Sequence, residues 1–131
     1  MLKEKVDKLV DKYLDEVISI RRHIHQNPEL SLKEFETSKF VANELRKIGL
    51  EAQEGVGKTG VVSNLNLGKG EKNLMLRADM DALPIQEETG LPFASKNPGV
   101  MHACGHDIHT SILLGVTKVL NEIKDEIKDR K

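Results

Sequence analysis

Apolar residues repeat at helical spacing over the first 26 residues, and this periodicity constrains the fold more than any other feature of the sequence. Charged residues fill the positions between them, which is the pattern of an amphipathic helix with one buried face. Asn27 and Pro28 should end the helix, because proline disfavours helical geometry in the residue before it. The sequence therefore predicts a helix over residues 2–26 with the apolar stripe Val6, Leu9, Val10, Tyr13, Leu14, Val17, Ile20 and Ile24.

Two more helices are indicated further along the chain. Ser31 stands where it would cap the start of the second, and Glu34, three residues later, completes a capping box. Gly49 should end that helix, because glycine readily adopts the left-handed conformation that follows a last helical turn. A third apolar repeat predicts a helix from about residue 108 to the end of the chain, with Asp107 as its N-cap.

The segment between the second and third helices has a different period. Residues 61–67 and 74–79 are short apolar or alternating runs separated by the polar, glycine-containing residues 68–73, which predicts a hairpin with a longer loop. Residues 84–101 contain three prolines and two glycines and should be mostly irregular. The order of helix, helix, strands, loop and helix indicates an α/β fold. So few strands make a poor closed sheet, and we therefore expect the chain to be part of a larger domain.

Charge and cysteine content exclude several function classes. The 20 basic and 21 acidic residues give a net charge of −1, which offers no electrostatic reason to expect nucleic acid as a partner. No apolar run approaches the ~20 residues that span a bilayer, and the charged N-terminus does not resemble a signal peptide. The single cysteine excludes an internal disulfide framework. These features predict a cytoplasmic protein without a membrane or nucleic-acid partner.

Three of the five histidines and the only cysteine fall within residues 102–109. Thiolate and imidazole are good ligands for zinc and its neighbours in the periodic table. The spacing of Cys104 and His106 lets both side chains point the same way from an extended loop, and Asp107 could orient a ligand imidazole or cap the following helix. Two protein ligands do not close a tetrahedral site, so further ligands must come from elsewhere.

Other interpretations of this cluster stay open at the level of sequence. Cys104 could act as a nucleophile with one of the histidines as its base. The cluster could also be a structural metal site in a binding module, or the chain could be a folded relic with neither metal nor catalysis.

A second group of polar residues lies between positions 74 and 84. In an extended strand side chains alternate, so Arg77, Asp79 and Asp81 should share one face while the apolar residues share the other. Two carboxylates beside an arginine suit metal coordination or orientation of a ligand, and they equally suit a salt-bridged edge strand. The cysteine and histidine cluster about 25 residues later favours the functional interpretation.

His23 and His25 form a third candidate group. They lie two residues apart on the predicted helix and therefore do not share a face. We interpret this segment as a helix end and turn with polar capping groups rather than as a metal site.

Three segments together resemble the N-terminal third of the M20-type metallo-amidohydrolases. They are RRHIHQNPELSLKE, LRADMDALPIQEETGLPFAS and GVMHACGHDIHTSILLG. Within that family they resemble the aminoacylase and hippurate hydrolase-like branch, which cleaves N-acyl amino acids and related amides. RADMDALP followed by HACGHD is specific in both content and spacing, and the resemblance extends over nearly the whole chain.

The resemblance implies a role for several residues of the second and third segments. Cys104 and His106 match metal ligands of the family's dinuclear site, which holds zinc, manganese, cobalt or nickel. Asp81 matches an acidic residue that orients the metal centre, and we assign it the catalytic role. His109 matches a position close to the site. Asp79 stands where broader family members carry histidine, so the resemblance does not extend a ligand role to it.

The resemblance also implies a fold and an activity. The fold would be part of the helix-flanked α/β catalytic domain of a zinc-peptidase-like enzyme, with residues 1–131 as its N-terminal part and the dimerisation domain absent. The activity would be metal-dependent hydrolysis of the amide bond of N-acyl amino acids or small peptides by a possible homo-oligomer in its full-length form. Family members are several times longer and carry their remaining ligands and catalytic glutamate downstream, so we expect the isolated chain to be inactive.

Overall fold

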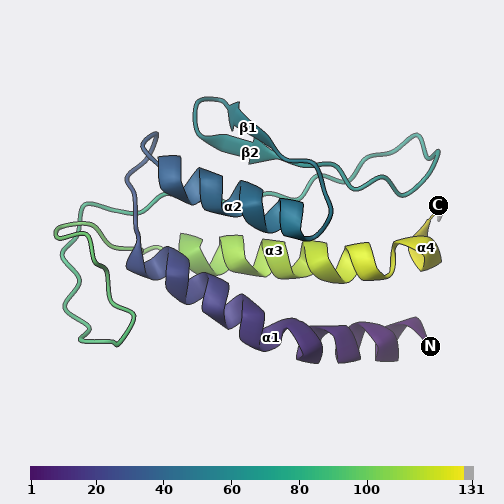
Figure 1. Ribbon diagram of the computed structural model, residues 1–131, viewed down its shortest axis with the longest axis horizontal. Coiled ribbons are helices and arrows are strands. Elements are labelled where there is room, and N and C mark those ends of the chain that lie inside the picture. The colour runs from purple at the N-terminus through teal and green to yellow at the C-terminus, as the bar shows by residue number, and fades with distance from the viewer. Residues whose placement is uncertain (129–131) are drawn as a thin grey trace.

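Two long antiparallel helices form the base of the molecule. The computed structural model describes residues 1–128, in which α1 (Leu2–Gln26) packs along α3 (His106–Glu122) (Figure 1). Helix α2 (Phe35–Lys47) lies on α3, and the hairpin of β1 (Gln53–Val56) and β2 (Gly60–Val62) lies against α2. A short helix α4 (Lys124–Ile127) follows α3 and ends near the N-terminus (Figure 1).

Helix α1 confirms the amphipathic pattern of the sequence. It ends at Gln26 with Asn27 as C-cap, as the Asn-Pro pair predicts. Ile20 and Ile24 pack with Val41, Leu45 and Leu114 in the core cluster. Val10 and Leu14 of the predicted stripe, however, are 49% and 50% exposed. Although α1 is 25 residues long, no helix within residues 1–128 is long and apolar enough to cross a membrane.

Helix α2 begins later than its sequence pattern suggests. Glu34 is its N-cap and makes no capping hydrogen bond, so the predicted capping box of Ser31 and Glu34 is wrong. Instead, the Glu29 carboxylate accepts hydrogen bonds from the backbone amides of Glu36 (3.1 Å) and Thr37 (2.6 Å) and from the Thr37 hydroxyl (2.6 Å). The buried Glu34 carboxylate is used elsewhere, because it accepts a hydrogen bond from Thr59.

The end of α2 confirms the role of Gly49. The Gly49 amide donates to the carbonyl of Arg46 (3.0 Å) and the Leu50 amide donates to that of Leu45 (3.1 Å). Gly49 has φ +93°, so these bonds make a Schellman motif around a left-handed residue.

The hairpin lies earlier in the chain than the predicted one. Strands β1 and β2 pair antiparallel around a turn at Gly57 and Lys58, whose φ angles are both positive. At Gly60 an added Cβ would lie 2.5 Å from the carbonyl oxygen of Val56, so this close approach requires glycine. The predicted hairpin of residues 61–67 and 74–79 is therefore wrong, because only Val61 and Val62 are in a strand.

Residues 63–80 contain no regular strand. Leu74 and Met75 are 86% and 85% exposed, since no backbone within residues 1–128 pairs with this part of the chain. Met80, at the end of this segment, packs against the core cluster. Two isolated bridges follow, a parallel one between Leu30 and Ala82 and an antiparallel one between Leu83 and Met101.

The third helix differs from its prediction at both ends. Its N-cap is Gly105, with φ +87°, and Asp107 lies inside the first turn. Asp107 does not cap the helix because its carboxylate bonds to side chains of α1. The helix breaks at Ile123, whose φ of −105° is not helical, before α4 begins. The predicted continuation beyond Lys128 lies outside the described residues.

Candidate metal centre

The loop that enters α3 is held by the bridge between Leu83 and Met101. The Leu83 amide donates to the Met101 carbonyl (2.9 Å), and the Met101 amide donates to the Leu83 carbonyl (3.0 Å). Asp81 lies two residues before one partner and Cys104 three residues after the other. The bridge thereby brings the RADMD and HACGHD motifs together, which their separation in the sequence does not reveal.

His106 and Asp81 are in direct contact. His106 Nδ1 lies 2.9 Å from Asp81 Oδ1 and 3.0 Å from the Asp81 carbonyl oxygen. Both oxygens are acceptors, so Nδ1 carries the proton and donates. The Nε2 lone pair of a neutral His106 is then available to a metal ion, and the carboxylate fixes the orientation of the ring.

Cys104 lies in the loop two residues before His106 and is exposed. Among residues 1–128, no group of three or more His, Cys, Asp and Glu side chains is arranged to hold a metal ion. The described residues thus offer at most two of the predicted donors together, and a complete coordination shell needs donors from outside them.

Asp79 and His109 flank this pair. The Asp79 carboxylate, 47% exposed, accepts a hydrogen bond from Arg77 (2.6 Å), so its nearest partner is a cation on its own segment. The Asp79 carbonyl accepts a bond from Thr110, which ties the segment to α3. The ring centroid of His109 lies 6.0 Å from that of His106. His109 is therefore near the candidate centre, as expected.

His102 is buried beside the same site without hydrogen bonds. It is 4% exposed, and neither ring nitrogen has a partner among the described residues. Burial lowers the pKa of His102, and the nearby charges of His25 and His106 lower it further, against the opposing charges of Asp107 and Asp81. The imidazole is therefore held neutral.

A buried network that the sequence did not predict lies behind the HACGHD loop. His25 Nδ1 is 2.7 Å from Asp107 Oδ2, and His25 Nε2 is 2.8 Å from Glu87 Oε1. Arg21 Nε donates to the same Asp107 oxygen at 2.9 Å. The segment is a helix end with a polar capping group, as predicted, because the Asn27 side chain donates to the His23 carbonyl (2.7 Å), but the sequence did not predict the contacts of His25. The one available indication was that Arg21 and His25 are four residues apart and share a helix face beside the apolar stripe.

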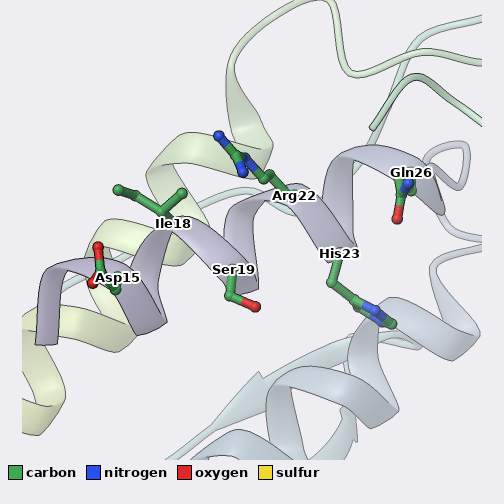
Figure 2. Close-up of a pocket in the computed structure, with 6 residues that line it drawn as sticks. All are labelled: Asp15, Ile18, Ser19, Arg22, His23 and Gln26. Carbon is green, nitrogen blue, oxygen red and sulfur yellow. The ribbon is translucent and has the colours of Figure 1, made fainter. Parts of the chain in front are cut away.

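A shallow hollow on the surface does not contain the predicted site residues. It lies along α1, where His23 turns toward α2 and stacks on Phe40 with ring centroids 4.1 Å apart (Figure 2). Its lining comes from a single helix, so it lacks the converging polar groups of a binding site. The lining residues are Asp15, Ile18, Ser19, Arg22, His23 and Gln26.

Comparison with known proteins gives consistent results. Residues 75–131 match the model of peptidase family M20/M25/M40. The chain is 48% identical over 128 residues to an N-acyl-L-amino acid amidohydrolase of Geobacillus stearothermophilus, covering 98% of this chain and 35% of that protein. It is 53% identical over 127 residues to thermostable carboxypeptidase 2 of Saccharolobus solfataricus, covering 96% of this chain and 32% of that protein.

A solved structure shows the same fold. The YXEP protein of Bacillus subtilis, described as a dinuclear metal binding peptidase from the M20 family, matches with a TM-score of 0.80 and 42% identity. The match covers 90% of this chain and 33% of that one. The chain spans about a third of the length of the curated relatives it matches. On these matches, the chain belongs to peptidase family M20/M25/M40.

Proposed function

We propose that this chain is the N-terminal part of the catalytic domain of a metal-dependent amidohydrolase. The whole enzyme would hydrolyse the amide bond of N-acyl amino acids or of related small amides and peptides. The names of the relatives from Geobacillus stearothermophilus and from Campylobacter jejuni, an N-acyl-L-amino acid amidohydrolase and a hippurate hydrolase, support this substrate class.

The hydrogen bond between His106 and Asp81 carries the proposal. It leaves the lone pair of His106 Nε2 free to bind a metal ion, and Cys104, two residues earlier in an exposed loop, would add a sulfur ligand. Asp81 holds the ring in one tautomer and raises the basicity of the ligand nitrogen. Thiolate with imidazole suits zinc, and also manganese, cobalt or nickel where these are available.

The chemistry divides between the cation and the chain. When bound, a divalent metal would polarise the amide carbonyl as a Lewis acid, and it would lower the pKa of water so that a nucleophile is available at neutral pH. The chain's own residues would bind and orient that cation: Cys104 and His106 as ligands, and Asp81 through His106. We infer that the full site holds two ions. Its other ligands and the carboxylate that moves the proton would come from outside the described residues, and the full-length protein would form a homo-oligomer.

Binding of Co²⁺ tests the ligand assignment directly. A cobalt–thiolate absorption band should appear in the near ultraviolet when the chain is titrated with Co²⁺ and should be absent in Cys104→Ser. His106→Ala should weaken binding at least tenfold. His23→Ala, on α1 and stacked on Phe40, is the histidine control away from the centre and should bind Co²⁺ within twofold of the unmodified chain.

Asp81 is tested by a charge-removing substitution. Asp81→Asn should weaken Co²⁺ binding about tenfold, by analogy with other groups that orient metal ligands, while the melting temperature changes little because Asp81 is 28% exposed. Asp79→Asn is the control for charge alone. Normal binding in Cys104→Ser and His106→Ala would reject the proposed centre, and a large loss of stability in Asp81→Asn with unchanged Co²⁺ affinity would make Asp81 structural.

A further inference from the structure

We propose that His25 is a positioning residue for the candidate metal centre. It joins Glu87, in the loop of residues 84–101, to Asp107, in the first turn of α3, and so fixes where Cys104 and His106 lie. This inference rests on the proposed function for the identity of the centre, and on the buried network for the role of His25.

The geometry of His25 differs from that of an ordinary buried histidine. Its side chain is 3% exposed, and both ring nitrogens lie within 2.8 Å of a carboxylate whose side chain is 1% exposed. Phe93 closes the edge of the ring, with centroids 5.7 Å apart in a T-shaped arrangement. The imidazole is thus enclosed and has a partner at each end.

Two carboxylates hold the ring from opposite sides. The Asp107 carboxylate lies 2.7 Å from Nδ1 and the Glu87 carboxylate 2.8 Å from Nε2, so His25 links two segments that are 20 residues apart in the sequence. Burial acts to raise the pKa of Glu87, but hydrogen bonds from Thr89 and the Ser95 amide, with the charge of His25, outweigh it and lower that pKa. Arg21 Nε lies 2.9 Å from Asp107 Oδ2, so both buried carboxylates of the network have partners.

The network controls both flanks of the candidate centre. Asp107 directly follows His106, so a shift of its carboxylate moves the backbone that carries the ligand imidazole. Glu87 also accepts a bond from the Ser95 amide (3.2 Å), and the Lys96 amide donates to the Gln26 carbonyl (2.8 Å). The loop of residues 84–101, which leads to Cys104, is therefore hydrogen-bonded to the last turn of α1 at two points.

Packing alone does not require this arrangement. A buried ion pair costs desolvation energy that an apolar side chain would not, and α1 and α3 already bury Ile20, Ile24 and Leu114 against each other. The polar network fixes the relative position of two segments, because hydrogen bonds at both ends of the His25 ring hold the Glu87 and Asp107 carboxylates at a set separation. Groups that orient metal ligands typically change metal affinity 10- to 100-fold.

The experiment compares two adjacent glutamates. Glu87→Gln keeps the size of the side chain and removes its charge, and Glu88→Gln makes the same change at an exposed neighbour that forms no ion pair within residues 1–128. Each variant is titrated with Co²⁺ and followed by the cobalt–thiolate absorption. We expect about tenfold weaker binding in Glu87→Gln and unchanged binding in Glu88→Gln. Glu87→Asp, which keeps the charge, should show a smaller loss and serves if Glu87→Gln does not fold.

A second measurement tests the positioning role without any metal. Nitrogen-15 spectra of histidine-labelled chain should show the ring signals of His106 shifted in Glu87→Gln and unchanged in Glu88→Gln. Unchanged His106 signals, or unchanged Co²⁺ affinity, in folded Glu87→Gln overturns the inference. Co²⁺ binding that is the same in Cys104→Ser, His106→Ala and the unmodified chain overturns the proposed function instead, and the two failures are therefore distinguishable.

Discussion

Two buried histidines, His25 and His102, show opposite ways of placing an imidazole inside this protein. His25 has a carboxylate at each nitrogen, whereas His102 has no hydrogen-bond partner among the described residues. Burial without a hydrogen-bond partner lowers the pKa of His102 and favours its neutral ring. Burial alone therefore does not determine the role of a histidine, and its hydrogen-bond partners must be known.

Glu87 should make the stability of the chain depend on pH in acid. Its pKa is lower in the folded protein than the ordinary value of 4.5, so the unfolded chain takes up a proton first as the pH falls. The contribution of Glu87 is therefore complete above about pH 4.5 and is lost as the pH falls through its folded pKa. Urea unfolding from pH 3 to pH 7 should show Glu87→Gln less stable by about 1.5–3 kcal/mol at pH 7, with the difference shrinking in acid.

Glu88→Gln is the control for this measurement and should match the unmodified chain at every pH. A Glu87→Gln difference that is the same at pH 3 and pH 7 would contradict the assignment, because it would then arise from shape and not from charge.

The sequence could predict part of the candidate site and not the rest. Cys104 and His106 belong to a dense local motif, so ligand chemistry and spacing were sufficient to single them out, whereas Asp81 was chosen over Asp79 on the family resemblance. The contact of His106 with Asp81 depends on the bridge between Leu83 and Met101, which pairs residues 18 positions apart. His25 was missed because its two partners lie 62 and 82 residues away, and no local pattern reports contacts at that range.

At the scale of elements, the start of α2 shows how a distant group can replace a local cap. The sequence favours Ser31, but the Glu29 carboxylate accepts the hydrogen bonds of the first turn. Glu29→Ala should therefore lower the unfolding free energy by about 1–2 kcal/mol, the cost of a lost cap, as measured by urea denaturation. Ser31→Ala should have almost no effect, and the reverse ranking of the two variants would restore the capping box.

The contact between α1 and α3 depends on a glycine in the middle of a helix. A Cβ added at Gly115 would lie 2.8 Å from Cγ2 of Val17, and valine has little rotamer freedom to move away. Gly115→Val should therefore lower the unfolding free energy by about 1–3 kcal/mol, as overpacking does. Val17→Ala should partly restore the stability of Gly115→Val. Strictly additive effects in this double-mutant cycle would show that the two side chains do not meet.

Helices were easier to predict from this sequence than strands. A helix completes its backbone hydrogen bonds locally, so the periodicity of residues 2–26 was sufficient for α1. A strand needs a partner, and the apolar run at residues 74–79 finds none within residues 1–128. The hairpin forms instead where Gly57 and Gly60 permit a tight turn, a backbone requirement that the hydrophobic pattern did not show.

At the scale of the whole molecule, the two ends of α3 make different contacts. The first turn carries His106 and the Asp107 network, and the last carries Glu122, which accepts hydrogen bonds from Tyr13 and from Lys12 (3.2 Å) of α1. Between them, Lys118 pairs with Glu16. These polar pairs set the register of α1 against α3, and thereby the place of His25 behind the candidate centre.

This separation leads to the prediction that the 131-residue chain alone hydrolyses no N-acyl amino acid at a measurable rate. Glu122 begins about 24 Å along the helix axis from His106 at 1.5 Å per residue, and Glu126 is paired with Lys5 beyond it, so neither can act as base at the centre. Nor do residues 1–128 offer a third metal donor there. The assay is release of free amino acid from N-acetyl and N-benzoyl substrates by purified chain loaded with Zn²⁺, Mn²⁺ or Co²⁺. Metal-dependent turnover that disappears in Cys104→Ala would contradict the prediction, because it would require a complete site built from the donors of this chain alone.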